Sequence, residues 1–471
     1  MADAVVVGAG PNGLAAALEL ARAGVTVEVL EGAPTPGGGC RTEALTLPGY
    51  RHDVCSAVHA LASASPFFSG VDLAAHGVRL LSPEVAFAHP LDGGRAGAVV
   101  ASVDDTARSL GADATAYRRL LGPLVERADE ILPEVLTVLR RPPRHPVAMA
   151  RFGAVGVLPM SRLARRFETD EARGLLAGVA AHAVRPVTAP LTGAFGLLLT
   201  VVAHTHGWPV VEGGSERLVD ALVGSLEAVG GSVATGRWVT DLAELDRPDA
   251  TILDTSPRTL LELGHDRLPS RYRAALAAYP YGPGLCKVDW ALRGPVPWAA
   301  EACRRAGTVH VGGTFEEVAA AEAAVADGQH PERPFCIVVQ PSVVDPWRAP
   351  AGHHTLWGYC HVPNGSDLDV TDAIESQIER FAPGFRDLVE ARVTTTNAAA
   401  ERTNPNYVGG DFSGGPSTVR YTLSRPTMRW NPYRTPAKGL YLCSSYTPPG
   451  GGVHGMCGVG AARAVLADLR R

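Results

Sequence analysis

The sequence lacks the patterns that mark several classes of protein. Its eight cysteines lie apart, with no C-x-x-C pair and no metal-ligand spacing, so neither a zinc site nor a disulfide framework is predicted. The longest apolar run, around residues 194–203, is shorter than the roughly 18 residues that cross a bilayer. No signal peptide precedes the first strand, and a formal net charge of −5 gives no reason to expect nucleic acid. We therefore expect a cytoplasmic protein that holds no metal ion.

Acidic residues are missing from residues 135–167, although the chain as a whole is slightly acidic. Seven arginines alternate there with apolar side chains: Arg140, Arg141, Arg144, Arg151, Arg162, Arg165 and Arg166. This mixture is typical of a surface that rests on anionic lipid, which predicts peripheral contact with the inner face of a membrane. The alternative is a solvated face that pairs with the acidic residues from Glu168 onward.

The chain does contain a glycine-rich turn near its start. A short apolar strand at residues 4–7 runs into the sequence Gly8, Ala9, Gly10, Pro11, Asn12, Gly13. Glycines at this spacing allow a tight turn, a close approach to a pyrophosphate and a helix packed near the sheet. The phosphates then lie at the helix N-terminus, where unpaired N–H groups favour negative charge.

The context that this motif requires follows at once. Residues 13–23 have apolar side chains at helical spacing, and a second apolar strand at residues 25–30 ends at Glu31. A carboxylate a little over twenty positions after Gly8 is suitably placed to bind a ribose. The motif alone does not separate NAD from FAD.

A second glycine cluster favours FAD. Gly37, Gly38 and Gly39 are followed by Arg41 and Thr42. This segment resembles the GG-x-x-R-T sequence of the flavin amine oxidase and phytoene desaturase superfamily, and the resemblance implies that Arg41 approaches the FAD pyrophosphate. An arginine beside a glycine turn supplies charge-assisted hydrogen bonds to phosphate.

Further segments carry the same resemblance. The stretch from Gly49 through Asp53 to Ser56 is similar to one that leads the phytoene desaturase-like chain past the flavin, and His59 follows it. A histidine near a flavin could move a proton, although a structural role is the alternative.

In the middle of the chain, residues 213–222 match GG-x-x-x-L-x-x-A-L and predict a helix over 215–229. Strands expected at 232–234 and 238–242 then return the chain to the dinucleotide domain, and the resemblance implies a backbone contact from Val239 to the adenine. A buried strand at residues 250–257 ends in Asp254, Thr255 and Ser256, of which Thr255 is a candidate cofactor contact.

Lys287 is the main catalytic candidate. It lies in an expected strand whose residues Val288, Trp290 and Leu292 face one side. In the amine oxidase relatives a lysine at a similar place holds a water beside flavin N5, so the resemblance implies a similar role here. A partly desolvated lysine could stabilise negative charge on the reduced flavin or on peroxide, whereas an ordinary strand-edge lysine is the alternative.

The C-terminal part completes the cofactor signature. Its sequence P-G-G-G-V-x-G-x-x-G resembles that of phytoene desaturase-like proteins and carotenoid ketolases. We expect a helix from about Val453, with Gly451 and Gly452 at its start, directed at the flavin. His454 would then lie beside the ring system, or cap or pack the helix.

These segments predict an α/β protein with an α+β substrate part. A Rossmann-type FAD-binding domain would be interrupted by a mixed-sheet substrate domain and a helical lobe over residues 103–139. The expected boundaries are 1–74, 206–280 and 426–471 for the FAD-binding parts, and 75–205 and 281–425 for the substrate parts.

The predicted function is that of a phytoene desaturase-like, FAD-dependent oxidoreductase. We expect it to remove a hydride from an apolar or amphipathic small molecule, with oxygen or another acceptor reoxidising the flavin. The alternatives are an amine or amino-acid oxidase and a non-catalytic, prenyl-binding escort-type protein. The substrate and the oligomeric state do not follow from the sequence.

Overall fold

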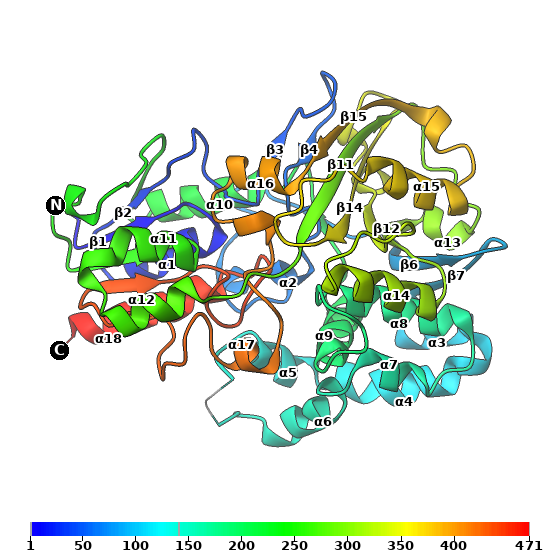
Figure 1. The fold of residues 1–471 in the computed structure, drawn as a ribbon, viewed down its shortest axis with the longest axis horizontal. Helices are drawn as coiled ribbons and strands as arrows, with labels where there is room; N and C mark the ends of the chain where they lie inside the picture. The colour runs from blue at the N-terminus through cyan, green and yellow to red at the C-terminus, as the bar shows by residue number, and fades with distance from the viewer. Residues whose placement is uncertain (1, 140–141, 471) are drawn as a thin grey trace.

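Two large sheets divide the molecule (Figure 1). The computed structural model describes residues 2–139 and 142–470. A five-stranded sheet lies on the side of the chain termini, and a seven-stranded sheet lies on the opposite side with a lobe of helices beneath it.

The five-stranded sheet is parallel and has the order β16-β10-β1-β2-β9. Its strands are β1 (Ala4–Val7), β2 (Val27–Leu30), β9 (Ser232–Ala234), β10 (Ala250–Leu253) and β16 (Leu440–Leu442). They come from three separate stretches of sequence, which fall within the three expected FAD-binding segments. The sheet is therefore assembled from parts of the chain that the other sheet interrupts.

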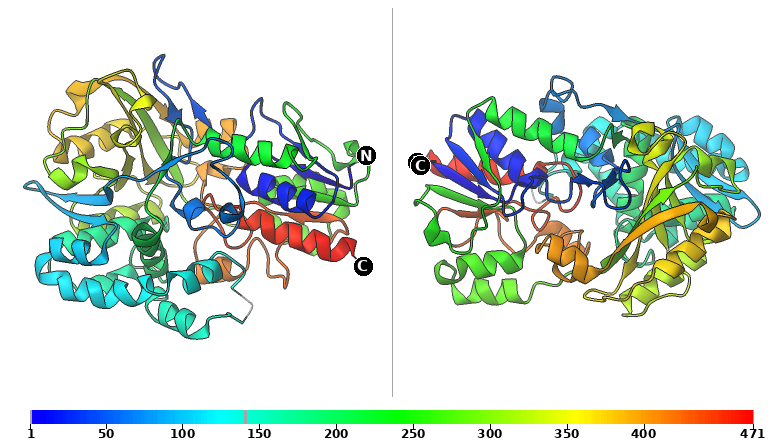
Figure 2. Two further views of the ribbon diagram at one scale, coloured as in Figure 1. Left: turned by 180° about the vertical axis from the view of Figure 1, so that it is seen from behind. Right: turned by 90° about the horizontal axis from the view of Figure 1, so that it is seen from above.

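Alternate residues of these strands pack against helices on opposite faces (Figure 2). Val6, Val29 and Ile252 lie in one core with three helices, whereas Val5, Val7 and Leu253 lie in a second core with two others. The first group is α1 (Pro11–Arg22), α10 (Glu216–Glu227) and α18 (Met456–Leu469); the second is α11 (Pro257–Gly264) and α12 (Ser270–Ala277). Helices on both faces of a parallel sheet make the doubly wound arrangement in which nucleotides bind at the carboxyl ends of the strands.

The seven-stranded sheet is mixed and has the order β15-β11-β14-β13-β12-β6-β7. Its strands are β6 (Val85–Leu91), β7 (Arg95–Val100), β11 (Gly284–Leu292), β12 (Ala306–Val311), β13 (Cys336–Val339), β14 (His354–Val362) and β15 (Val389–Thr395). One face packs on α13 (Glu301–Arg304) and α15 (Thr371–Phe381). The other packs on α8 (Asp170–Ala181), α14 (Phe315–Ala326) and the rest of the helical lobe.

The helical region expected over residues 103–139 consists of several short helices, and the helical lobe continues beyond it. The lobe contains α3 (Val103–Ser109), α4 (Ala114–Val125), α5 (Ala128–Val135), α6 (Pro146–Gly156), α7 (Met160–Ala164) and α9 (Thr192–Thr205). Gly111 has a φ of +57°, and Arg127 a φ of −116°, so the backbone leaves the helical conformation at both places.

The strand expected at residues 238–242 is also wrong. Residues 238–241 are irregular, and a 3₁₀ turn follows at Leu242–Glu244. The Asp241 carboxylate accepts a hydrogen bond from the main-chain N–H of Ala243, and Glu244 accepts one from the N–H of Asp241. This capping box stabilises a helical turn at the place where a strand would continue.

The remaining short elements connect these layers. They are β3 (Thr42–Glu43), β4 (His52–Asp53), β5 (Leu80–Leu81), β8 (Val210–Val211), α2 (Ala60–Ser63), α16 (Asn397–Thr403) and α17 (Val419–Leu423). All eight cysteines are free thiols. Within residues 2–139 and 142–470, no helix combines the length and apolar character needed to cross a membrane.

Candidate functional site

The first glycine turn lies between β1 and α1. Gly8 has a φ of +101°, which L side chains rarely adopt, and a Cβ on Gly13 would lie 2.1 Å from the carbonyl oxygen of Gly8. Helix α1 has Pro11 at its start, no acidic residue within its own first turn and no capping side chain at its N-cap residue, Gly10. This helix N-terminus can therefore receive an anion.

The second glycine turn packs directly on the first. The N–H of Gly37 donates to the carbonyl oxygen of Ala9 over 2.8 Å, and a Cβ on Gly38 would lie 3.3 Å from Cα of Gly10. Arg41 follows this turn, with its side chain 13% exposed. The predicted phosphate-binding arginine thus lies beside the predicted phosphate-binding turn.

The C-terminal segment reaches the same place through α18. A Cβ on Gly458 would lie 2.0 Å from the carbonyl oxygen of Asn12, so α18 and α1 are in backbone contact. The helix begins at Met456 and not at about Val453 as expected, because Gly455, with a φ of +69°, precedes its first turn. Gly451 and Gly452 lie in the exposed loop before it.

Three buried polar atoms in this region have no hydrogen-bond partner among the described residues. They are Oδ1 of Asn12, Nε of Arg41 and Oγ1 of Thr255. Buried polar atoms are rarely left without a partner, so these atoms indicate a polar ligand. An amide oxygen, a guanidinium N–H and a hydroxyl beside two glycine turns fit the phosphates and hydroxyl groups of a dinucleotide.

Glu31 lies at the end of β2, next to the first glycine turn. Its Oε2 accepts a hydrogen bond from the N–H of Ala9 and its Oε1 one from the N–H of Ala33, both over 2.8 Å. Each carboxylate oxygen can accept another bond, so a ribose hydroxyl can still bind. The segment before Val239 runs beside it, since the N–H of Arg237 donates to the carbonyl oxygen of Glu31 over 2.8 Å.

Asp254 is a functional candidate that the sequence interpretation noted only as a strand end. Its Oδ2 accepts a hydrogen bond from the N–H of Gly13 over 2.8 Å, at the start of α1. Burial, with a smaller contribution from the neighbouring Glu31, raises the pKa of this carboxyl to about 7, against the hydrogen bond from Gly13, which lowers it. The sequence feature that could have identified Asp254 is its position as an acidic residue at the end of a buried strand, β10, which pairs with β1, the strand before the first glycine turn.

Ser56 and Thr42 belong to a buried network that connects the two halves of the molecule. Asp53 accepts hydrogen bonds from Thr42 Oγ1 over 2.9 Å, from the N–H of Ser215 over 2.8 Å and from Arg348 Nη1 over 3.0 Å. The hydroxyl of Ser215 donates to the carbonyl oxygen of Ser56. Burial acts to raise the pKa of Asp53, but Arg348 and the bonds from Ser215 lower it below its usual value, so the carboxylate stays charged.

Lys287 is buried on β11 and pairs with Asp289 on the same face of the strand. Its Nζ lies 5.6 Å from the centre of the Trp357 ring. Burial raises the pKa of Asp289 to about 6, and Lys287 opposes this increase. Asp289 Oδ1 lies 3.6 Å from His52 Nδ1, so the pair faces the segment that leads away from the second glycine turn.

The two histidines predicted as catalytic are both buried. His59 Nε2 bonds to Ser215 Oγ over 2.9 Å, and burial lowers the pKa of His59 to about 4. In His454, Nδ1 accepts from the N–H of Met456 over 3.0 Å and Nε2 bonds to the carbonyl oxygen of Gly450 over 3.2 Å. His454 thus closes the turn before α18, with both ring nitrogens occupied.

Comparisons with known proteins extend over most of the chain. Residues 6–69 match the family described as NAD(P)-binding Rossmann-like domain. The chain is 26% identical to mouse "Pyridine nucleotide-disulfide oxidoreductase domain-containing protein 2", over 99% of this chain and 94% of the relative. It is 41% identical to hydroxyneurosporene desaturase of Rhodobacter capsulatus over 17% of this chain and 15% of the relative. The solved structure of cyclohexylamine oxidase from Brevibacterium oxydans superposes with a TM-score of 0.60 at 15% identity, covering 100% of both chains.

These matches bear out four predictions made from the sequence. They are the resemblance to desaturase and amine oxidase proteins, the Rossmann-type fold, an oxidoreductase and FAD as the cofactor. The desaturase match covers a short part of the chain, and the amine oxidase likeness concerns the fold. The substrate is therefore a separate question.

Proposed function

We propose that this protein is an FAD-dependent oxidoreductase that removes a hydride from an apolar or amphipathic small molecule. The observation that carries the proposal is the convergence of three separated segments on one place, with buried polar atoms of Asn12, Arg41 and Thr255 left without a partner in the described chain. FAD bound there would supply the two-electron acceptor for the substrate.

Each predicted contact has a distinct task in this proposal. Arg41 and the N–H groups of α1 neutralise the pyrophosphate, and Glu31 accepts from the ribose, with Val239 beside the adenine. Thr42 and Ser56 hold the second turn in place through the Asp53 network. Gly451 and Gly452, which are exposed, and Val453, which is half-buried, would form the rim beside the ring system.

Of the three catalytic candidates, the proposal retains Lys287. Lysine is the one group of the three whose ammonium could stabilise negative charge next to the substrate face. Asp289 compensates that charge in the buried state, and Trp357 covers one side of it. His59 and His454 have positioning roles, because the first joins Ser215 and the second closes a turn.

An amine is a second candidate substrate, favoured by an aromatic group beside Lys287. Trp357 and Tyr359 lie edge to face with ring centres 5.2 Å apart, and Tyr359 and Phe412 lie edge to face at 5.4 Å. Aromatic faces attract ammonium groups and also pack on hydrocarbon chains. Anaerobic mixing of the yellow protein with carotenoid precursors, amines and amino acids separates these cases, since only a substrate bleaches the flavin.

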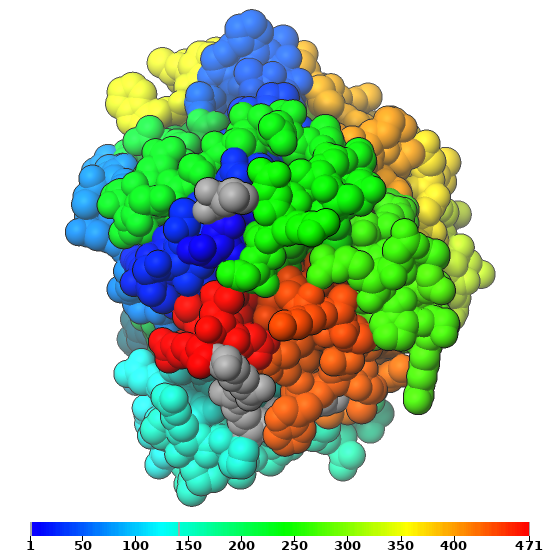
Figure 3. Space-filling view, turned by 90° about the vertical axis from the view of Figure 1, so that its left-hand side faces the viewer, coloured from blue at the N-terminus to red at the C-terminus, as the bar shows by residue number. Residues whose placement is uncertain are grey.

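The proposal includes contact with an anionic membrane through one face of the molecule. Exposed apolar side chains gather in residues 139–157 and 419–430: Leu139, Val147, Val157, Val419, Leu423, Met428 and Trp430. Both segments lie on the same side of the molecule, near α6 and α17 (Figures 1 and 3). We name this set the lipid face.

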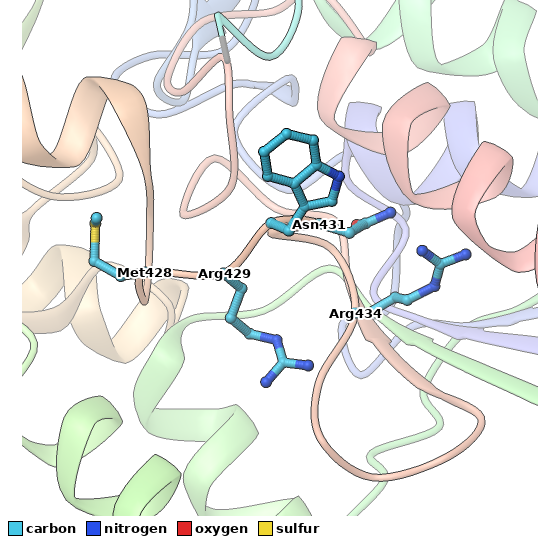
Figure 4. A pocket seen from close by; sticks show the side chains of 5 residues that line it. Met428, Arg429, Asn431 and Arg434 are labelled. Atoms are coloured by element: carbon cyan, nitrogen blue, oxygen red, sulfur yellow. The ribbon is translucent and has the colours of Figure 1, made fainter. Parts of the chain in front are cut away.

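The distribution of charged residues also supports contact between the lipid face and an anionic membrane. Residues 135–167 and 412–467 contain no Asp or Glu, whereas Arg144, Arg151 and Arg420 lie within them; Arg140 and Arg141 fall outside the described residues. Trp430, which is 86% exposed, stands beside a surface hollow that Met428, Arg429, Asn431 and Arg434 also line (Figure 4). Tryptophan with arginine is typical of a membrane–water interface.

Sedimentation with vesicles tests the lipid face. The protein should bind vesicles of phosphatidylglycerol and not vesicles of phosphatidylcholine alone, and Trp430→Ser with Val147→Ser should weaken the binding at least about fivefold. Trp347→Ser is the matched control, because Trp347 is 78% exposed but lies outside the lipid face. Equal sedimentation with both lipids would remove this part of the proposal.

A single measurement tests the cofactor proposal. The purified protein should be yellow, with flavin absorbance and one FAD released per chain on denaturation. A colourless protein that does not take up added FAD would support the non-catalytic alternative instead.

A further inference from the structure

The two faces of the seven-stranded sheet differ in chemistry. The face under α15 is apolar and contains Val288, Trp290, Cys336 and Cys360. The alternate residues, which face the helical lobe, include polar side chains on several strands: Lys287 and Asp289, His361, His310, and His89. All are less than 3% exposed, so this polar row is inside the protein.

His361 is held by a carboxylate at one nitrogen only. Its Nδ1 lies 2.9 Å from both Oε1 and Oε2 of Glu322 on α14, and both side chains are at most 3% exposed. Its Nε2 is buried and has no hydrogen-bond partner among the described residues. A buried imidazole nitrogen without a partner costs free energy unless a ligand or water supplies one.

The bond to Glu322 decides which nitrogen carries the proton. Because carboxylate oxygens only accept, Nδ1 must donate. In the neutral imidazole, the proton on Nδ1 leaves the lone pair of Nε2 free to accept a hydrogen bond. Nε2 is therefore an acceptor, and its partner must bring an O–H or an N–H.

The neighbouring histidines do not supply the hydrogen-bond donor that Nε2 of His361 lacks. His182 and His310 share a hydrogen bond between their Nε2 atoms over 2.9 Å, and a Cβ on Gly178 of α8 would lie 2.7 Å from His89 Nδ1. Burial lowers the pKa of His182 to about 3 and that of His89 to about 4, so both rings are uncharged near neutral pH. In the part of the chain that the structure describes, no group of His, Cys, Asp and Glu could hold a metal ion.

The surroundings of His361 are otherwise aromatic. The ring centre of Tyr359 lies 5.6 Å from that of His361, and Phe335 lies 6.3 Å away and also next to His310. Lys287 stands opposite Tyr359 across β11 and β14, while Leu285 stands opposite His361. The Cα atoms of Lys287 and His361 are thus diagonal neighbours, about 7–8 Å apart.

We propose that His361 is a specificity-determining residue whose Nε2 accepts a hydrogen bond from an O–H or N–H group on an otherwise apolar substrate. The inference deepens the proposed function and rests on it, since it assigns the substrate class to the same site. Because Lys287 is so near, the donor group lies on or close to the carbon that is oxidised. Hydrocarbons, ethers and carbonyl compounds offer no such donor and bind more weakly.

Fluorescence titration of the FAD-loaded protein with matched apolar probes tests whether ligands that carry an O–H or N–H group bind more tightly. Quenching of tryptophan fluorescence, from a chain with seven tryptophans, reports binding without turnover. The probes share one isoprenoid body: retinol carries an O–H, retinylamine an N–H, and retinyl methyl ether and retinal no donor. We expect retinol or retinylamine to bind at least about tenfold more tightly than the ether and the aldehyde, a difference of about 1.4 kcal/mol.

Variants assign the preference to His361. The His361→Phe variant should bind all four probes with Kd values within about threefold of one another. The control is His265→Phe, the same exchange at a histidine whose side chain is 59% exposed, and it should keep the preference for the donor probes. If His361→Phe does not fold because Glu322 is left buried, the double variant His361→Phe with Glu322→Leu removes both partners and serves instead. Glu322→Gln should retain the preference, because the amide oxygen can still accept from Nδ1.

The outcomes separate this inference from the proposed function. Equal binding of all probes, no binding of any, or a preference that survives His361→Phe would overturn the role of His361. A colourless protein that still prefers the donor probes would overturn the proposed function but not the hydrogen bond to Nε2 of His361.

Discussion

The main-chain N–H of Gly13, in the first turn of α1, donates to the buried carboxylate of Asp254 over 2.8 Å. The two residues are 241 positions apart in sequence and meet at the glycine turn, where we propose that a pyrophosphate binds. A carboxylate there places negative charge at a position suited to a phosphate, so its protonation should govern how well the cofactor binds.

FAD binding should therefore weaken as pH rises through 7. Burial raises the pKa of Asp254 to about 7, so the group is neutral below that pH and repels the pyrophosphate above it. We expect the Kd to increase roughly tenfold between pH 6 and 8, and Asp254→Asn to abolish that increase. Equilibrium titration of the apoprotein measures it, with the exposed Asp246→Asn as control.

The same group should affect stability in the absence of FAD. Because the folded pKa of Asp254 exceeds the unfolded one, the folded state binds the extra proton, and the free energy of unfolding should fall as pH rises from about 4 to about 7. Urea unfolding of wild type and Asp254→Asn across this range would reveal the difference; parallel pH profiles would contradict the assignment.

Replacing Arg41 by alanine should reduce FAD affinity about 10- to 100-fold. In the proposed site the guanidinium would form charge-assisted bonds to the pyrophosphate that contribute about 1.5–3 kcal/mol each, and its Nε has no partner among the described residues. The exposed Arg51 is the control, and Arg51→Ala should leave the Kd unchanged. Full FAD retention by Arg41→Ala would remove its assigned role.

Lys287→Met should slow reoxidation of the reduced flavin by oxygen at least tenfold, since it removes the ammonium that we propose stabilises the developing negative charge. The substitution also leaves Asp289 buried without its partner, so Lys287→Met with Asp289→Asn tests the lysine without that charge. Lys438, the chain's only other lysine, is exposed and provides Lys438→Met as control. Stopped-flow absorbance gives the rate, and an unchanged rate in both variants would exclude Lys287 from this step.

Gly458→Ala should destabilise the protein by about 1–3 kcal/mol and release FAD. The new Cβ would lie 2.0 Å from the carbonyl oxygen of Asn12, so α18 must move away from α1. Gly153→Ala in α6 is the control, because no atom lies within 4 Å of its Cβ, and it should be neutral or stabilising by up to about 1 kcal/mol. Urea unfolding and free flavin fluorescence measure both effects.

The cofactor segments were predictable because their signals are local. Gly8, Gly13 and Arg41 lie in short motifs whose geometry follows from the residues themselves. Asp254 was missed as a site residue since its contact with Gly13 requires the two strands to be neighbours in the sheet.

His361 and Glu322 were missed for a related reason. They meet only through the register of β14 with its neighbours and the packing of α14, which a single sequence does not contain. At residues 238–242 a local signal was present but missed, because Asp241 followed by Glu244 is a capping box, which favours a helical turn over a strand.

The interrupted course of the chain also sets an order of events during synthesis. Strand β16 and helix α18 close the five-stranded sheet, and α18 contacts the glycine turn that was made first. Until residues 440–469 emerge from the ribosome, one edge of β10 and one side of α1 remain uncovered. Cofactor loading must therefore follow translation of that region, and a nascent chain stalled before it would expose apolar surface to chaperones and proteases.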